Sequence, residues 1–213
     1  MQNISSSIDL ETNNLYESQQ STLYGIPIIY ADAYFFNRKK LISQAKILVD
    51  TIFSTFGKTL QFPLNTEPIE KFLSGYEIKF TPFNNKLKEN PNYEGFYYLK
   101  EDGKTLQIFY NTHCSIGRQR FTKMHELFHF CQSRDEFFLD IIDDLIENDT
   151  LPIDLIVQLV EKSSDKATTF YLMPENIFIK KYYELDKSVK KLSNYFQTSQ
   201  QSVIYRLKEC KLI

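Results

Sequence analysis

Two of the three histidines in this chain stand four positions apart, within the stretch RQRFTKMHELFHFCQ at residues 118–132. Because four residues make about one turn of an α-helix, His125 and His129 would project from the same helix face. Two imidazoles placed in this way can bind one metal ion. Glu126 directly follows the first histidine and would then lie close to a water on that metal. This H-E-x-x-H spacing is typical of zinc peptidases, so the stretch predicts a metal-dependent hydrolytic site.

A catalytic zinc site of this kind needs a third protein ligand, because two histidines and a water fill only three of four positions. His113 is the only other histidine, and the chain has no C-x-x-C spacing, so a carboxylate is expected. On spacing alone, the acidic residues downstream of the motif are all candidates: Glu136, Asp140, Asp143, Asp144, Glu147, Glu161, Asp165 and Glu175.

Glu161 differs from the other candidates because Asp165 follows it by one helical turn. A histidine that binds a metal usually donates its second ring N–H to a carboxylate or a carbonyl, which fixes the orientation of the ring. Glu161 as ligand and Asp165 as that acceptor would meet both needs from one helix. The alternative is a solvated acidic pair on a surface helix, and the spacing does not decide between the two.

The apolar patterns around these residues predict the elements that must position them. Helical spacing of apolar residues extends over residues 37–57, with Asn37 as a candidate N-cap and Gly57 as a candidate stop. A shorter helix is expected over residues 66–75. Three aromatic and β-branched runs follow at residues 76–80, 95–99 and 105–111, and KEDGK between the last two is a hairpin signal.

The second half of the chain is expected to be mainly helical. The histidine helix is followed by helices over residues 135–148 and 152–174, and then by two short helices around a turn at Gln197 and Thr198. The last pair has the spacing of a helix-turn-helix, and residues 180–213 are locally basic. Helices, a small sheet and further helices in this order predict an α+β fold.

Composition and charge limit the class of protein. The chain has 213 residues, 42% hydrophobic content and a formal net charge of −2, which predicts a soluble protein with no overall attraction to nucleic acid or membrane. Cys114, Cys131 and Cys210 are odd in number, which disfavours a disulfide framework and fits a reducing cytoplasm. The N-terminus lacks the features of a secretory signal, and the most apolar run is too short to span a bilayer.

The same patterns predict the domain organisation. Residues 1–22 are rich in Ser, Asn, Gln and Thr and are expected to form a disordered tail. A helical extension is expected over residues 23–60, a catalytic domain over 61–179, and a helical segment packed on it over 180–213.

Two segments together resemble the ImmA/IrrE family of metallopeptidases. The family pattern R-x-R-F-T-x-x-H-E-x-x-H is matched by RQRFTKMHELFH, and its later E-x-E-A-D/N-x-F-A-x-x-L-L-M-P is similar to EKSSDKATTFYLMP. The similarity extends over roughly residues 66–209. It departs from the pattern at Phe128, where the family commonly has Gly, and at Ser164, Ala167, Thr168 and Phe170. No departure removes a ligand, but a bulky Phe128 beside His129 is expected to narrow the cleft.

The resemblance implies a zincin-like domain with a small antiparallel sheet and one Zn²⁺ held by His125, His129 and Glu161. Glu126 would be the general base, and Asp165 would orient a liganding histidine. The group that opposes the developing oxyanion is left unassigned. The resemblance also implies a cytoplasmic endopeptidase of narrow specificity that cleaves a helix-turn-helix repressor and thereby derepresses mobile-element or stress genes. A substrate of such an enzyme lies extended beside an edge strand, for which LQIFYN at residues 106–111 is the candidate.

A different class of function is also compatible with the sequence. The metal could be a structural clip in a non-proteolytic regulator that binds a repressor, or DNA through its basic C-terminal segment. A charge excess on a packed helical pair explains that segment more simply than DNA contact does. Glu126 distinguishes the two classes, because a purely structural site has no use for a base beside an open coordination position.

Overall fold

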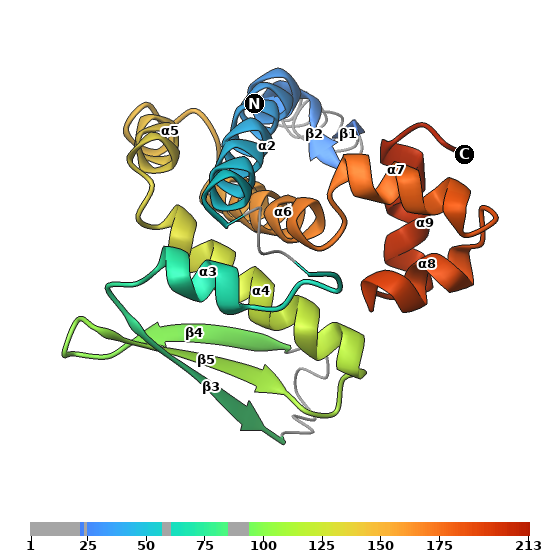
Figure 1. Cartoon of the computed structure of the whole chain (residues 1–213). Coiled ribbons are helices and arrows are strands. Elements are labelled where there is room, and N and C mark those ends of the chain that lie inside the picture. Colours follow the sequence, from blue (N-terminus) through green and yellow to red (C-terminus); the bar gives the residue numbers. More distant parts are fainter. Residues whose placement is uncertain (1–21, 24, 57–60, 85–93) are drawn as a thin grey trace, which may run out of the picture.

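A computed structural model of the chain describes residues 22–23, 25–56, 61–84 and 94–213 (Figure 1). The tail expected over residues 1–22 lies outside the described residues except for Thr22. The α+β fold class is confirmed, with helices on one side of a small three-stranded sheet.

The sheet contains β3 (Glu77–Phe83), β4 (Gly95–Leu99) and β5 (Thr105–Asn111) in the order β3-β5-β4. The expected hairpin is present, because β4 and β5 are antiparallel and are joined through Asp102 and Gly103. The Asp102 side chain accepts hydrogen bonds of 2.8 Å from the backbone N–H groups of Lys104 and Thr105. The Thr105 hydroxyl donates to the same carboxylate at 2.6 Å, and this bond, together with the two backbone bonds, lowers the pKa of Asp102 to about 2.

The prediction of a purely antiparallel sheet is wrong, because β3 pairs with β5 in parallel. The two strands of a hairpin must be antiparallel, but nothing local fixes the side on which a third strand joins. Here β3 joins beside β5 and leaves β4 as an edge, so the sheet is mixed.

The longest helix, α2 (Ile28–Phe56), begins nine residues before the expected N-cap. Asn37 therefore lies inside the helix, where it is buried and its side-chain amide donates to the carbonyl of Ala33 at 2.9 Å. Neither glycine nor proline occurs between Ile28 and Asn37 to stop the helix from starting early. Pro27 ends the short β2 (Ile26–Pro27), which pairs with β1 (Thr22–Leu23). Gly57, the expected stop, lies outside the described residues.

The helix that carries the histidines is α4 (Ile116–Gln132). It lies between the sheet and the pair formed by α2 and α6 (Ile153–Leu172), as Figure 1 shows. The expected helices over residues 66–75 and 135–148 correspond to α3 (Glu67–Phe72) and α5 (Glu136–Glu147). The main core lies between these layers and contains Leu106, Leu127 and Phe128.

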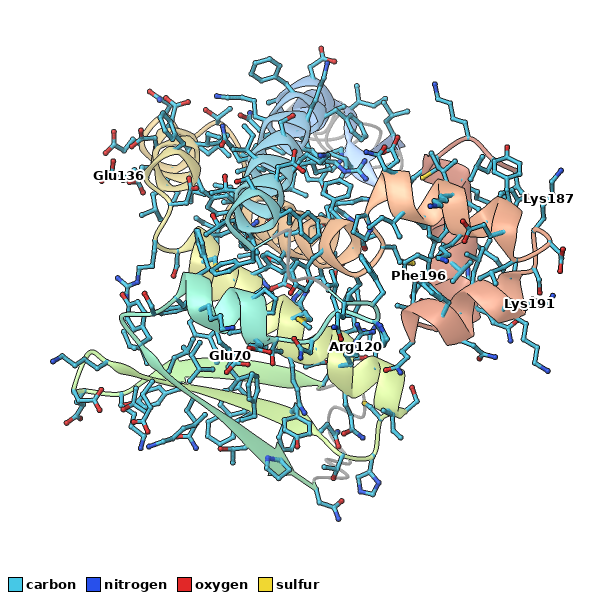
Figure 2. The ribbon with its side chains drawn as sticks, in the orientation of Figure 1. Glu70, Arg120, Glu136, Lys187, Lys191 and Phe196 are labelled. Atoms are coloured by element: carbon cyan, nitrogen blue, oxygen red, sulfur yellow. The ribbon has the colours of Figure 1, made fainter. Side chains whose placement is uncertain are left out.

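Three helices follow at the C-terminal end: α7 (Glu175–Glu184), α8 (Val189–Phe196) and α9 (Gln200–Glu209). The expected turn between the last two is present, with Gln197 in the left-handed region at φ 51°. Arg120 of α4 ties this end to the histidine helix, because its guanidinium donates to the carbonyl of Phe196 (Figure 2). The same guanidinium also donates to the carbonyl of Leu64, which precedes α3.

Candidate metal centre

Helix α4 presents its two histidines toward α6. The helix begins at Ser115, whose hydroxyl accepts a hydrogen bond from the backbone N–H of Arg118 at 3.3 Å. The face of α4 that carries Leu127 and Phe128 is fully buried in the core. The side chains of His125 and His129 are only 14% and 12% exposed, and His125 lines a cleft beside α6.

Three candidate ligand atoms converge between α4 and α6. The Nε2 atoms of His125 and His129 are 2.9 Å apart. Glu161 lies opposite them, with Oε2 at 3.2 Å from Nε2 of His125 and Oε1 at 3.4 Å from Nε2 of His129. Two imidazole nitrogens and one carboxylate, all within 4.8 Å of one another, are a donor set that suits Zn²⁺.

Each histidine has a polar neighbour at its other ring nitrogen. Nδ1 of His125 lies 3.1 Å from Oδ1 of Asp165, the residue expected to orient a ligand. Nδ1 of His129 lies 3.0 Å from the hydroxyl of Ser164. Both Nε2 atoms consequently face Glu161, which is the orientation that metal binding requires.

In the metal-free protein, the protonated His125 and the carboxylates of Asp165 and Glu161 stabilise one another's charged forms. Burial lowers the pKa of His125, but the carboxylates of Asp165 and Glu161 outweigh burial and raise it to about 9. The hydrogen bond from His125 is the largest of the causes that hold the pKa of Glu161 well below its usual range. In the metal-free protein, the proton on His125 therefore supplies the positive charge that balances the carboxylates of Asp165 and Glu161.

Glu126 lies on the wall of the same cleft with only 9% of its surface exposed. Burial raises its pKa above the usual value for a glutamate, although the nearby histidines oppose the shift. A carboxylate whose pKa is raised toward neutrality is suited to accept and return a proton.

The cleft has a volume of about 490 Å³. Gly95 at the start of β4 forms one wall, and Phe121, whose ring stacks on His125 with 6.0 Å between centroids, forms another. Arg118 of α4 and Glu94 form an ion pair at the same opening.

Two expectations about the cleft are wrong. The segment LQIFYN is not an edge strand, because β5 is the central strand and both of its edges are paired. The edge strand that reaches the cleft is β4, through Gly95. Phe128 does not narrow the cleft: it is fully buried and packs against Tyr171 with 5.7 Å between ring centroids. Adjacent helical residues point about 100° apart, so Phe128 faces the core when His129 faces the cleft.

Apart from Asp165, which contacts His125, the other candidate ligands do not belong to this cluster. Among the residues that the structure describes, His125, His129 and Glu161 form the one cluster able to hold a metal. His113 is exposed and does not line the cleft. Glu175 instead faces Arg206 at 3.9 Å.

The sequence did not identify Ser164 and Gln132 as residues of the site. Ser164 was visible as a departure from the family pattern, but its contact with His129 depends on how α6 is rotated against α4. Gln132 lies one turn after the motif's last histidine, and only the packing of the two helices reveals that it contacts Ser164.

Comparisons with known proteins agree with this geometry. The model of the Peptidase_M78 family, described as the IrrE N-terminal-like domain, matches residues 76–208. The comparison with curated proteins finds no match. A transcriptional regulator of Mycobacterium tuberculosis has a similar fold, with a TM-score of 0.56, 15% sequence identity and 85% of this chain covered. The match spans only 52% of that regulator, so this chain corresponds to about half of its length.

In the described part of the chain, no helix combines the length and the apolar character that crossing a bilayer requires.

The family match covers more than half of the sequence and includes both histidines, Glu126 and Glu161. The chain therefore belongs to the Peptidase_M78 family, with an IrrE N-terminal-like domain.

Proposed function

We propose that this protein is a zinc-dependent endopeptidase that cleaves a helix-turn-helix transcriptional repressor in the cytoplasm. The observation that carries the proposal is the convergence of His125, His129 and Glu161 beside the buried Glu126. Membership in the Peptidase_M78 family supports the reaction class. The repressor as substrate and the cytoplasmic location rest on the resemblance and on the cysteine usage described above.

The residues of the site have distinct tasks in this proposal. His125, His129 and Glu161 would hold one Zn²⁺, which in such a site activates a water and polarises the scissile carbonyl. Glu126 removes a proton from the water as its oxygen bonds to the carbonyl carbon. The same carboxyl then delivers that proton to the nitrogen as the C–N bond breaks, so the leaving amine departs neutral. Asp165, whose Oδ1 lies 3.1 Å from Nδ1 of His125, would keep Nε2 of that histidine turned toward the metal.

Among the residues that the structure describes, β4 is the candidate backbone partner for the substrate. This strand is the edge of the sheet nearest the cleft, so an extended peptide could pair with it and bring a peptide bond over the histidines. The side chains of Arg118 and Glu94 lie at the same end of β4 and would contact such a peptide.

The alternative function, a binding module with a structural metal, has less support. A structural site does not require a buried glutamate next to the ligands. Part of the positive charge of the C-terminal segment is also engaged within the chain, since Lys181 pairs with Glu184 and Lys191 with Asp186, each at 2.6 Å.

Glu126→Gln separates the two functions, because it removes the base without removing a ligand. We expect a co-expressed helix-turn-helix repressor to be shortened by the wild-type protein and to remain intact with this variant, while zinc binding is unchanged. Loss of one catalytic proton-transfer group typically costs about 10²–10⁴-fold in rate. Glu147→Gln on α5 is the matched control, since Glu147 lies outside the candidate site. Equal cleavage by wild type and Glu126→Gln would contradict the proposed role of Glu126.

A further inference from the structure

A chain of buried polar groups leads from His129 across α6 and α4 to α2. Nδ1 of His129 lies 3.0 Å from the hydroxyl of Ser164, and that hydroxyl lies 2.5 Å from Oε1 of Gln132. Nε2 of Gln132 lies 2.9 Å from the hydroxyl of Ser163, and this second hydroxyl lies 3.1 Å from the carbonyl oxygen of Leu41. Ser163 and Ser164 are fully buried, and Gln132 is 2% exposed.

The last group in the chain determines the direction of every hydrogen bond. A backbone carbonyl can only accept, so the single hydroxyl proton of Ser163 must be donated to Leu41. Ser163 must then accept from the amide nitrogen of Gln132, which turns the amide oxygen toward Ser164. Ser164 donates its only proton to that oxygen.

These hydrogen-bond directions determine which ring nitrogen of His129 carries the proton. Because the proton of Ser164 is already donated to Gln132, its oxygen can only accept from His129, which places a proton on Nδ1. A neutral imidazole carries one proton, so Nε2 keeps its lone pair free toward His125 and Glu161. This is the tautomer that can bind a metal through Nε2.

The two serines depart from the usual behaviour of hydroxyls in a helix. Serine and threonine inside helices commonly donate to the carbonyl four residues earlier. Thr168 and Thr169 on the same helix do so, bonding to the carbonyls of Ser164 and Asp165 at 2.9 and 2.8 Å. Ser163 and Ser164 instead bond across to α2 and α4, which indicates a role beyond satisfying their own hydroxyls.

We propose that Ser164, Gln132 and Ser163 are positioning residues that fix His129 as the Nδ1–H tautomer, and that α2 anchors them through the carbonyl of Leu41. Helix α2 ends before residue 76, where the family match begins, so the anchor lies outside the matched domain. Figure 1 shows how α6 lies between α2 and α4 and can connect them. The inference deepens the proposed function, since it rests on His129 being a metal ligand.

The test reads the tautomer and the metal affinity separately. Ring ¹⁵N NMR of the metal-free protein reports which nitrogen of neutral His129 carries the proton, and only three histidines need assignment. Competition with a chromophoric chelator gives the Kd for Zn²⁺. The variants are Ser164→Ala, which removes the acceptor of His129, and Ser163→Ala, which removes the anchor without touching His129. Thr168→Val is the matched control, because it removes a buried α6 hydroxyl that bonds only to its own helix.

We expect wild-type His129 to carry its proton on Nδ1. Ser164→Ala should shift population toward Nε2–H and weaken zinc binding by about 10–100-fold, the usual cost of losing a partner of a liganding histidine. Ser163→Ala should change both quantities in the same direction but by less, because Ser163 lies three hydrogen bonds from His129. Thr168→Val should match the wild type.

Two results would overturn the inference: a wild-type His129 protonated on Nε2, or a Ser164→Ala variant with unchanged tautomer and Kd. If the wild type bound zinc tightly under either result, the proposed metal site would stand and only the positioning chain would fail. If the wild type showed the Nδ1–H tautomer, sensitive to both serine changes, but bound no zinc, the chain would stand and the proposed function would fail. Far-UV circular dichroism of each variant confirms that the fold is kept.

Discussion

At the scale of single residues, the proposed metal site requires that a proton and a metal compete for His125. In the metal-free protein the pKa of His125 is raised to about 9, because the carboxylates of Asp165 and Glu161 outweigh the opposing effect of burial. A histidine must be neutral to bind a metal, so the bound proton has to leave when zinc enters.

This competition predicts proton release with a definite pH dependence. At about pH 7, zinc binding should release close to one proton from His125, and the release should fall toward zero as the pH rises past the folded pKa of about 9. The apparent affinity for zinc should rise over the same range. Titration calorimetry in two buffers with different ionisation enthalpies measures the released protons. A release that stays constant across this range would contradict the charge state assigned to His125.

The stability of the metal-free protein should follow the opposite trend. Because the folded pKa of His125 lies above the ordinary value of 6.5, its charged form stabilises the fold fully below pH 6.5. That contribution is lost as the pH rises from 6.5 through about 9.

Much of the residue-level site could be predicted from the sequence. His125 and His129 share a helical turn, so local periodicity alone places them together. Glu161 lies 36 residues from His125, and the spacing left eight carboxylates open until a family pattern was available. The contact of Ser164 with His129 depends on the rotation of α6 about its axis, for which the sequence carries no local signal.

At the scale of elements, the close approach of β4 to α4 shapes the cleft. A Cβ atom at Gly95 would overlap the methyl group of Thr122 on α4 and the carbonyl oxygen of Phe109 on β5. The backbone of Phe109 lies on one side of residue 95 and the buried helix α4 on the other, so an added side chain would have little room to move. The glycine therefore lets the edge strand lie directly against the helix that carries the histidines.

Gly95→Ala should destabilise the protein by about 1–3 kcal/mol, the usual cost of forcing an extra group into a packed site. The same change should weaken cleavage, since β4 would move away from α4 at the cleft. Gly75→Ala is the matched control, because no atom lies within 4 Å of a Cβ there and its φ is not positive. Denaturant unfolding of the two variants provides the comparison, and equal stabilities would show that β4 and α4 are not tightly packed at Gly95.

The errors in the predicted elements have tertiary causes. The hairpin of β4 and β5 follows from an Asp-Gly turn, which is local chemistry. Which strand lies at the edge depends on where β3 joins, so the expectation for LQIFYN was wrong although its strand was correct. The early start of α2 at Ile28 has a similar origin: Asn37 resembles an N-cap, but its side chain is buried against α2's own backbone.

At the scale of the whole molecule, the candidate metal centre lies where the two packed layers meet. Helix α4 packs on the sheet, α6 packs on α2, and the candidate ligands lie where α4 and α6 meet. The N-terminal extension, which had no evident role in the sequence, packs through α2 along α6 and thereby supports the helix that carries Glu161. A metal held between α4 and α6 would consequently stabilise the entire fold as well as the cleft.

One positive charge of the basic C-terminal segment, that of Arg206, has a structural role. Arg206 is 3% exposed and donates to the carbonyl of Met173 at 3.1 Å, so its charge holds α9 against the end of α6. Because Arg206 is buried, residues 180–213 present less positive charge to a DNA backbone than their sequence indicates.

Zinc binding by single-residue variants tests most directly whether three side chains from α4 and α6 share one ion. We expect the wild-type protein to bind one Zn²⁺ per chain in an equilibrium titration against a competing chelator. His129→Ala and Glu161→Ala should lose that tight site, whereas Glu147→Ala, whose carboxylate lies on α5, should keep it. Full retention of zinc by Glu161→Ala, or its loss by Glu147→Ala, would contradict the metal centre described for this protein.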